Sequence, residues 1–162
     1  MSLKAGVVGL GIMGGAFARN MLENDVEVIG FDVVDAAVTA LVPFGLKVAT
    51  SPADVAIQAD IVITSLPTPA AFHAVMTGAD GIADAARDGL IIVDTCTLAL
   101  TDKQIAHDDL AAKGVVLLDC PVSGTGAQAA VRDLALIGSG DTAAFEVARP
   151  VLETFTRVVE YV

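Results

Sequence analysis

The sequence predicts an α/β fold in which helices cover a doubly wound, mostly parallel sheet. Three observations support this. Apolar runs of strand length alternate with helical patterns, the core residues are mostly aliphatic, and a glycine-rich turn joins the first strand to the first helix. We expect residues 1–162 to form one domain, because the length is ordinary for one and no repeat or linker interrupts the chain.

Short apolar runs bounded by turn residues predict eight strands, since buried parallel strands are nearly continuous in Val, Ile and Leu. These runs are Leu3–Val8, Glu27–Phe31, Leu46–Ala49, Asp60–Ser65, Leu90–Val93, Val115–Leu118, Leu134–Gly138 and Arg157–Val162.

Helical periodicity and start signals predict the intervening helices. In the first helix, apolar residues recur every four positions, at Met13, Phe17 and Met21. Two further helices are expected at Ala36–Leu41 and Ala70–Met76, and another begins at Ser51 with Pro52 at its first position. A helix from Thr101 to Lys113 is expected to start with a capping box of Thr101 and Gln104. The last helix, Asp141–Phe155, is expected to kink at Pro150.

The composition excludes several classes of partner. The net charge is −11 and the nine Lys and Arg residues are scattered, so we expect neither a nucleic-acid nor a membrane partner. No apolar run has the length of a membrane span. Two cysteines, Cys96 and Cys120, in a chain without a signal-like start favour a reducing, cytoplasmic location. We expect no metal site.

The most specific motif is the segment Gly9-Leu10-Gly11-Ile12-Met13-Gly14, which follows the first predicted strand. Its first glycine permits a tight turn, its second lets a pyrophosphate approach the backbone, and its third lets the helix pack on the strand. Asp32 ends the second predicted strand, where a carboxylate can accept the ribose hydroxyls of an adenosine. The segment and Asp32 therefore predict a Rossmann-like dinucleotide site.

The charges near Asp32 favour NAD over NADP as the cofactor. The 2′-phosphate of NADP needs a cation beside the adenosine ribose. The five residues that follow Asp32 contain no base, and Asp35 adds a second acid that would repel a phosphate.

Beyond these motifs, the chain resembles the N-terminal half of the β-hydroxyacid dehydrogenase family, which includes 3-hydroxyisobutyrate dehydrogenase and tartronate semialdehyde reductase and is related to 6-phosphogluconate dehydrogenase. The resemblance covers essentially all of the chain. Three segments carry it: the glycine turn, Asp94-Thr95-Cys96-Thr97, and Asp119-Cys120-Pro121-Val122-Ser123-Gly124 with the strand that follows.

The resemblance implies roles for residues at the ends of later strands. Leu66 and Pro67 would line the nicotinamide ribose side, and Thr97 would contact the cofactor. The substrate carboxylate would be held by hydroxyl and backbone N–H groups of Ser123, Gly124 and Thr125. Cys96 and Thr125 depart from the family pattern where the distal part of the substrate should lie, so a related small hydroxy acid, such as a sugar acid, is expected.

The resemblance also implies an oxidoreductase that transfers a hydride reversibly between NAD and the C–OH of a small hydroxy carboxylate. The family's catalytic lysine lies on an all-helical second domain, which is absent from these residues and expected beyond Val162. None of Lys4, Lys47, Lys103 and Lys113 occupies its position. The chain alone is therefore expected to bind cofactor without catalysis, and the full-length enzyme to be a homo-oligomer.

Two other functions stay open at this point. One is an imine reductase-like relative on the same scaffold, which would reduce C=N rather than C=O. The other is a stand-alone, non-catalytic NAD-binding domain, although such a domain would have no use for a carboxylate-binding loop.

The remaining reactive side chains are expected to be structural. We interpret Cys96 and Cys120 as buried packing residues, and His73 and His107 as solvated helix positions. Asp94 and Asp119 are expected to accept hydrogen bonds from loop N–H groups.

Overall fold

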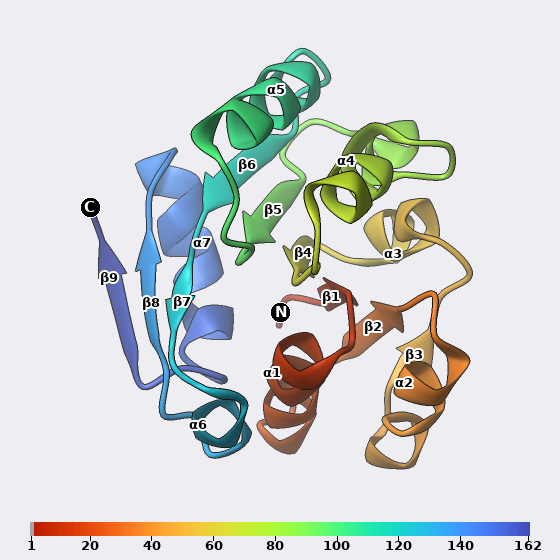
Figure 1. Cartoon of the computed structure of the whole chain (residues 1–162), viewed down its shortest axis with the longest axis vertical. Helices are drawn as coiled ribbons and strands as arrows, with labels where there is room; N and C mark the ends of the chain where they lie inside the picture. Colours follow the sequence, from red (N-terminus) through yellow and green to blue (C-terminus); the bar gives the residue numbers. More distant parts are fainter. Residues whose placement is uncertain (1) are drawn as a thin grey trace.

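A computed structural model describes residues 2–162, and its centre is a six-stranded, all-parallel sheet (Figure 1). Each strand pairs in register with its neighbours, which confirms the predicted parallel, doubly wound architecture. In spatial order the strands are β3 (Lys47–Val48), β2 (Val28–Phe31), β1 (Ala5–Val8), β4 (Ile61–Thr64), β5 (Ile91–Asp94) and β6 (Val116–Asp119).

Helices cover both faces of this sheet, and each face has its own apolar core. Alternate strand residues point to opposite faces, so Ile61 and Ile63 join one core while Val62 joins the other. One face carries α1 (Ile12–Glu23), α2 (Asp35–Thr39), the short helix η1 (Val42–Phe44) and α7 (Thr142–Leu152); the other carries α3 (Pro52–Gln58), α4 (Pro69–Thr77), η2 (Ile82–Ala85) and α5 (Leu100–Ala111).

The last strands form a separate small sheet at the β6 edge (Figure 1). It contains β7 (Val122–Ser123), β8 (Ala135–Gly138) and β9 (Val158–Tyr161), with β7 antiparallel and β9 parallel to β8. The two last predicted strands therefore exist but lie outside the main sheet. The strand β7 was not predicted, because two residues are too few to show a period.

Local start signals predicted one helix cap correctly and one wrongly. The Ser51 hydroxyl accepts a hydrogen bond from the Asp54 N–H (3.0 Å), with Pro52 at the first helical position, as expected. The capping box at Thr101 is wrong, because α5 begins after Ala99 and has no side-chain cap. A complete capping box instead joins Thr125 and Gln128 at the start of α6 (Gly126–Ala130), a helix that was not predicted.

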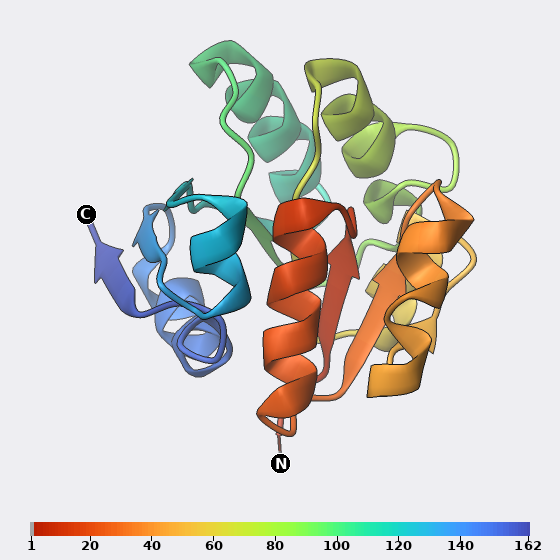
Figure 2. The ribbon, with the colours of Figure 1, turned by 60° about the horizontal axis from the view of Figure 1, so that its bottom comes forward.

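The C-terminal part of the chain docks on α1. Figure 2 shows α6 beside α1 in front of the main sheet. The buried Asn20 side chain on α1 donates from Nδ2 to the Ala129 carbonyl oxygen at 2.9 Å. The ring of Phe17, also on α1, stacks on the ring of Phe155, which follows α7, with the centroids 4.6 Å apart. These contacts hold the loop before α6 near the start of α1.

No helix among residues 2–162 combines the length and the apolar character that crossing a membrane would require.

The Asn20→Ala variant should be destabilised by about 1–2 kcal/mol, because a buried amide–carbonyl hydrogen bond between α1 and α6 is lost. Urea unfolding followed by circular dichroism would measure the free energy of unfolding. Gln104→Ala is the matched control, since this exposed amide bonds only the nearby Asp108 side chain. Equal stability of the two variants would contradict the role given to Asn20.

Candidate cofactor site

A cleft of about 600 Å³ opens at the carboxyl ends of β1, β2 and β4. The strand order reverses direction between β1 and β4, and ligands of doubly wound sheets bind at such a point. The cleft brings together seven of the predicted cofactor residues: Gly9, Gly11, Ile12, Met13, Asp32, Leu66 and Pro67.

Two of the three motif glycines are required by the protein's own packing. Gly9 has a φ of +93°, and a Cβ there would lie 2.0 Å from the Ser65 carbonyl oxygen. At Gly14, a Cβ would lie 1.8 Å from the Gly9 carbonyl oxygen. Gly14 is therefore a packing residue beneath the turn, and any side chain at either position would push β1, β4 and α1 apart.

Gly11 differs, because among residues 2–162 no atom outside its own chain segment lies within 4 Å of the place where its Cβ would be. Its φ is −70°, which any residue can adopt, so neither backbone strain nor internal packing explains the glycine. What the bare backbone leaves is free space against the cleft. A group that must approach the backbone closely, such as a pyrophosphate, fits this space.

The start of α1 suits an anion at the same place. Gly11 is the N-cap, no side chain caps the helix, and its first turn contains no acidic residue. The first-turn N–H groups and the positive end of the helix dipole are therefore available to a ligand. An acidic chain can hold an anionic cofactor in this way without a basic patch.

Asp32 ties the end of β2 to the glycine turn. Its Oδ2 accepts from the Leu10 N–H at 2.7 Å, and its Oδ1 accepts from the Val34 N–H at 2.8 Å. The Leu10 side chain packs in the core, so Leu10 contributes its backbone rather than its side chain. Each carboxylate oxygen keeps acceptor capacity for one further donor, as two ribose hydroxyls would require.

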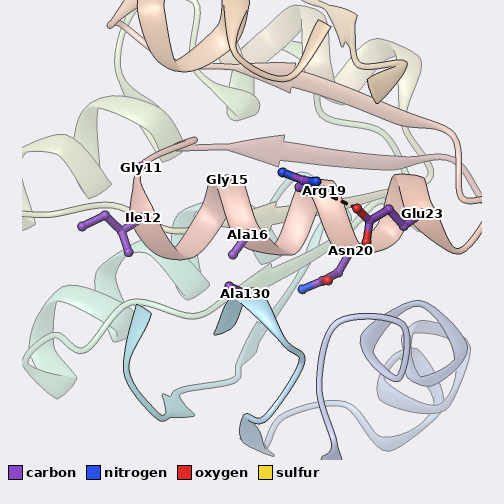
Figure 3. A pocket seen from close by; sticks show the side chains of 8 residues that line it. All are labelled: Gly11, Ile12, Gly15, Ala16, Arg19, Asn20, Glu23 and Ala130. Atoms are coloured by element: carbon purple, nitrogen blue, oxygen red, sulfur yellow. Dashed lines mark hydrogen bonds and ion pairs between the residues drawn. The ribbon is translucent and has the colours of Figure 1, made fainter. Parts of the chain in front are cut away.

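A second pocket, of about 550 Å³, lies on the other flank of α1 (Figure 3). It shares Gly11 and Ile12 with the cofactor cleft and is closed on the far side by Ala130 of α6. Arg19 and Glu23 form an exposed ion pair along it, at 2.9 Å. The residues that line this pocket run along α1 from Gly11 to Glu23, with Ala130 of α6 opposite them.

The predicted substrate loop precedes α6 and lies outside the walls of the cofactor cleft. Ser123 and Gly124 are exposed, and Gly124 has a φ of +146°. The Thr125 N–H donates to Gln128 Oε1 at 2.8 Å, and its hydroxyl accepts from the Gln128 N–H at 3.2 Å. Thr125 therefore shapes the loop as a helix cap, and its amide is already engaged.

The β5–α5 loop places Cys96 and Thr97 differently. Cys96 is 5% exposed, and its sulfur accepts from the Leu66 N–H at 3.1 Å. Burial, reinforced by Asp94, raises the pKa of Cys96 to about 12, so the thiol is protonated at neutral pH. Thr97, the next residue, is exposed. Cys96 is thus a buried packing residue, as predicted. Only the small exposed part of its side chain could contact a substrate directly.

Asp94 accepts from a loop N–H group as expected, because its Oδ1 lies 3.4 Å from the Cys96 nitrogen. The Asp119 carboxylate accepts from Lys103 instead, and Lys103 is a partner of both aspartates that was not predicted. Both carboxylates lie 2.6 Å from the ammonium of Lys103, which is almost fully buried. A signal was present, because Lys103 shares the inner face of α5 with Ala106 and Leu110, at helical spacing.

The two histidines also differ from each other. His107 is an exposed helix residue, as predicted. His73 on α4 is half-buried instead, with Nε2 2.7 Å from the Asp102 carboxylate of α5.

Comparison with known proteins identifies this arrangement. Residues 4–162 match the family model described as the NAD binding domain of 6-phosphogluconate dehydrogenase. The chain is 34% identical over 161 residues to 2-(hydroxymethyl)glutarate dehydrogenase of Eubacterium barkeri, covering 99% of this chain and 54% of that protein. The chain spans about half the length of the curated relatives it matches.

Solved structures agree. The 3-hydroxyisobutyrate dehydrogenase of Mycobacterium tuberculosis, solved with L-serine, superimposes with a TM-score of 0.92 at 32% identity, covering 99% of this chain and 54% of that one. An imine reductase of Streptomyces aurantiacus gives 0.88 at 27% identity, with 98% and 55% covered. The chain therefore belongs to the family of NAD-binding domains represented by that of 6-phosphogluconate dehydrogenase, as an N-terminal domain of the β-hydroxyacid dehydrogenase type.

Proposed function

We propose that this domain binds NAD, in preference to NADP, for reversible hydride transfer to or from the C–OH carbon of a small hydroxy carboxylate. The observation that carries the proposal is the free space over Gly11, flanked by uncapped helix N–H groups and by the Asp32 carboxylate. The bound nicotinamide would accept or supply the hydride, while this chain supplies position and charge complementarity.

In this proposal the adenosine half lies on the β2 side of the cleft and the nicotinamide half on the β4 side. Asp32 accepts the ribose hydroxyls, and the Gly11 backbone with the first turn of α1 faces the pyrophosphate. Leu66 and Pro67 line the nicotinamide side, with Thr97 at the neighbouring loop. Residues 33–37 provide no cation for a 2′-phosphate.

The substrate carboxylate would be held by the Ser123 hydroxyl and the Gly124 N–H, with Thr125 fixing the loop as the cap of α6. Because Gly126 lies against Ile12, this loop is adjacent to the glycine turn. A second half of the enzyme, of the kind that accounts for the remaining length of the relatives, would carry the catalytic lysine as general acid and base. Assembly as a homo-oligomer and a cytoplasmic location belong to this proposal, the latter supported by two buried free thiols.

The likeness to an imine reductase supports a second candidate, reduction of a cyclic C=N bond. The exposed Ser123–Gly124 loop favours the hydroxy acid, because a carboxylate needs such donors and a cyclic imine does not. Parallel turnover assays of the catalytically competent protein with hydroxy acids and with cyclic imines would separate the two.

Calorimetric titration with NADH and NADPH tests the cofactor proposal. NADH should bind at least tenfold more tightly, because the two acids at 32 and 35 repel a 2′-phosphate. Asp32→Ala should weaken NADH binding by about 1–3 kcal/mol through loss of charged hydrogen bonds. A preference for NADPH would overturn the charge argument, and unchanged NADH affinity in the variant would remove Asp32 from the site.

The glycines provide a matched pair of variants with opposite expectations. Gly11→Ala should leave the melting temperature nearly unchanged but weaken NADH binding, because the new methyl group occupies only ligand space. Gly14→Ala should lower the melting temperature strongly, since its Cβ overlaps the Gly9 carbonyl oxygen. Normal NADH affinity in Gly11→Ala would show that the pyrophosphate does not lie there.

Ser123→Ala in the catalytically competent protein should raise KM for a carboxylate substrate about tenfold, while the Kd for NADH stays constant. Thr142→Ala provides a control, because this exposed hydroxyl bonds only Tyr161 on the small sheet. An unaltered KM would exclude Ser123 from the substrate site.

A further inference from the structure

A buried ion cluster lies at the carboxyl ends of β5 and β6, on the nicotinamide side of the proposed site. Lys103 Nζ lies 2.6 Å from Asp94 Oδ2, 2.6 Å from Asp119 Oδ1 and 2.7 Å from the Cys96 carbonyl oxygen. Burial lowers the pKa of Lys103, but the two carboxylates outweigh it and leave this pKa raised. The ammonium is therefore charged. It donates hydrogen bonds to the Cys96 carbonyl and to Asp119, and it forms an ion pair with Asp94.

Both Asp94 and Lys103 are held in place by their partners. Asp94 is fully buried. Its Oδ1 accepts from the Thr64 hydroxyl at 2.6 Å and from the Cys96 N–H at 3.4 Å, while its Oδ2 forms the ion pair with Lys103 and has no hydrogen-bond partner among residues 2–162. A buried carboxylate without its counter-ion is strongly unfavourable, so moving the ammonium away from Asp94 has a large free-energy cost. Lys103 is thus a rigid donor beside the β5–α5 loop.

Cys96 connects this cluster to the cofactor cleft. Its carbonyl oxygen accepts from Lys103, while its sulfur accepts from the backbone N–H of Leu66, a residue that lines the cleft. The path from the buried ammonium to the cleft wall therefore contains two hydrogen bonds and a single intervening residue. Asp32, on β2, takes no part in it.

We propose that Lys103 is a positioning residue for the nicotinamide side of the cofactor cleft. By holding the Cys96 carbonyl it fixes the Cys96–Thr97 turn, and through the Cys96 sulfur it fixes the Leu66 backbone. The inference rests on the proposed function, because it assigns the Leu66 wall to the nicotinamide half of the cofactor. The adenosine half is held by the Asp32 side of the cleft, independently of Lys103.

The test compares two ligands that differ at one end. NADH contains both halves of the cofactor, whereas ADP lacks the nicotinamide and the ribose attached to it. In Lys103→Met the Kd for NADH should rise about tenfold, because the Leu66 wall is no longer held in place, while the Kd for ADP changes less than twofold. Lys113→Met is the control, since it removes an equal charge from an exposed position at the end of the same helix region.

A double variant controls for loss of folding in Lys103→Met. Lys103→Met leaves Asp94 as an uncompensated buried charge, whereas Asp94→Asn/Lys103→Met removes both charges and still lacks the bond to Cys96. The double variant should show the same selective loss of NADH affinity. Unchanged NADH binding in a folded variant, or equal weakening of NADH and ADP, would overturn the inference.

A readout without cofactor separates this inference from the proposed function. Hydrogen exchange of the Leu66 amide, followed by NMR, should accelerate about tenfold in the variants, because its acceptor at Cys96 is loosened. The Leu10 amide, bonded to Asp32, should not change. Equal acceleration of both amides would mean general loosening and contradict the inference, whereas a wild-type chain that binds no NADH would contradict only the proposed function.

Discussion

The close packing of the glycine turn against the end of β4 is the constraint on which the rest of the site depends. Gly9 lies so near the Ser65 carbonyl, and Gly14 so near the Gly9 carbonyl, that neither place has room for a Cβ. This contact sets where α1 begins relative to β1 and β4, at the point where the strand order reverses. The uncapped helix start, the bare Gly11 backbone and the cleft beside them all follow from that placement.

Around this turn the two sides of the cleft are held by different means. On the β2 side, where we propose that the adenosine half lies, the half-buried Asp32 carboxylate accepts from the backbone N–H groups of Leu10 and Val34. On the β4 side, where we propose that the nicotinamide half lies, the wall comes from the loops after β4 and β5. Backbone hydrogen bonds join the starts of these loops, as at Thr95 N–H to the Thr64 carbonyl. The buried ion cluster and Cys96 add links between three elements distant in sequence.

Much of the main sheet, and the cofactor cleft, could be predicted because their signals are local. Apolar runs, a glycine motif and Ser51-Pro52 each report the structure of their own segment. The strands β8 and β9 were predicted, but their separation into a small sheet was not, because it depends on pairing with each other and with β7 rather than on any local pattern. Nor could the capping boxes be told apart: Thr101 and Thr125 both precede a Gln by three residues, and only tertiary packing decides which helix starts there. The burial of Lys103 had a local signal in its helical spacing with Ala106 and Leu110, but its two ion pairs could not be predicted, because the acids lie 9 and 16 residues away.

The ion cluster is better explained by geometry than by stability. Desolvating a lysine and an aspartate offsets most of their attraction, so a buried pair contributes little net free energy compared with an apolar pair of similar size. What an apolar pair would lack is direction: a methyl group cannot hold a carbonyl oxygen at 2.7 Å. At Lys103 the same ammonium that neutralises Asp94 also orients the Cys96 carbonyl. In hydride transfer the donor and acceptor carbons must lie about 3–3.5 Å apart, and a misplacement of about 1 Å can cost about 10²-fold in rate. A rigid, directional anchor behind the wall that we propose for the nicotinamide would meet that requirement, whereas a purely apolar contact would let the loop shift.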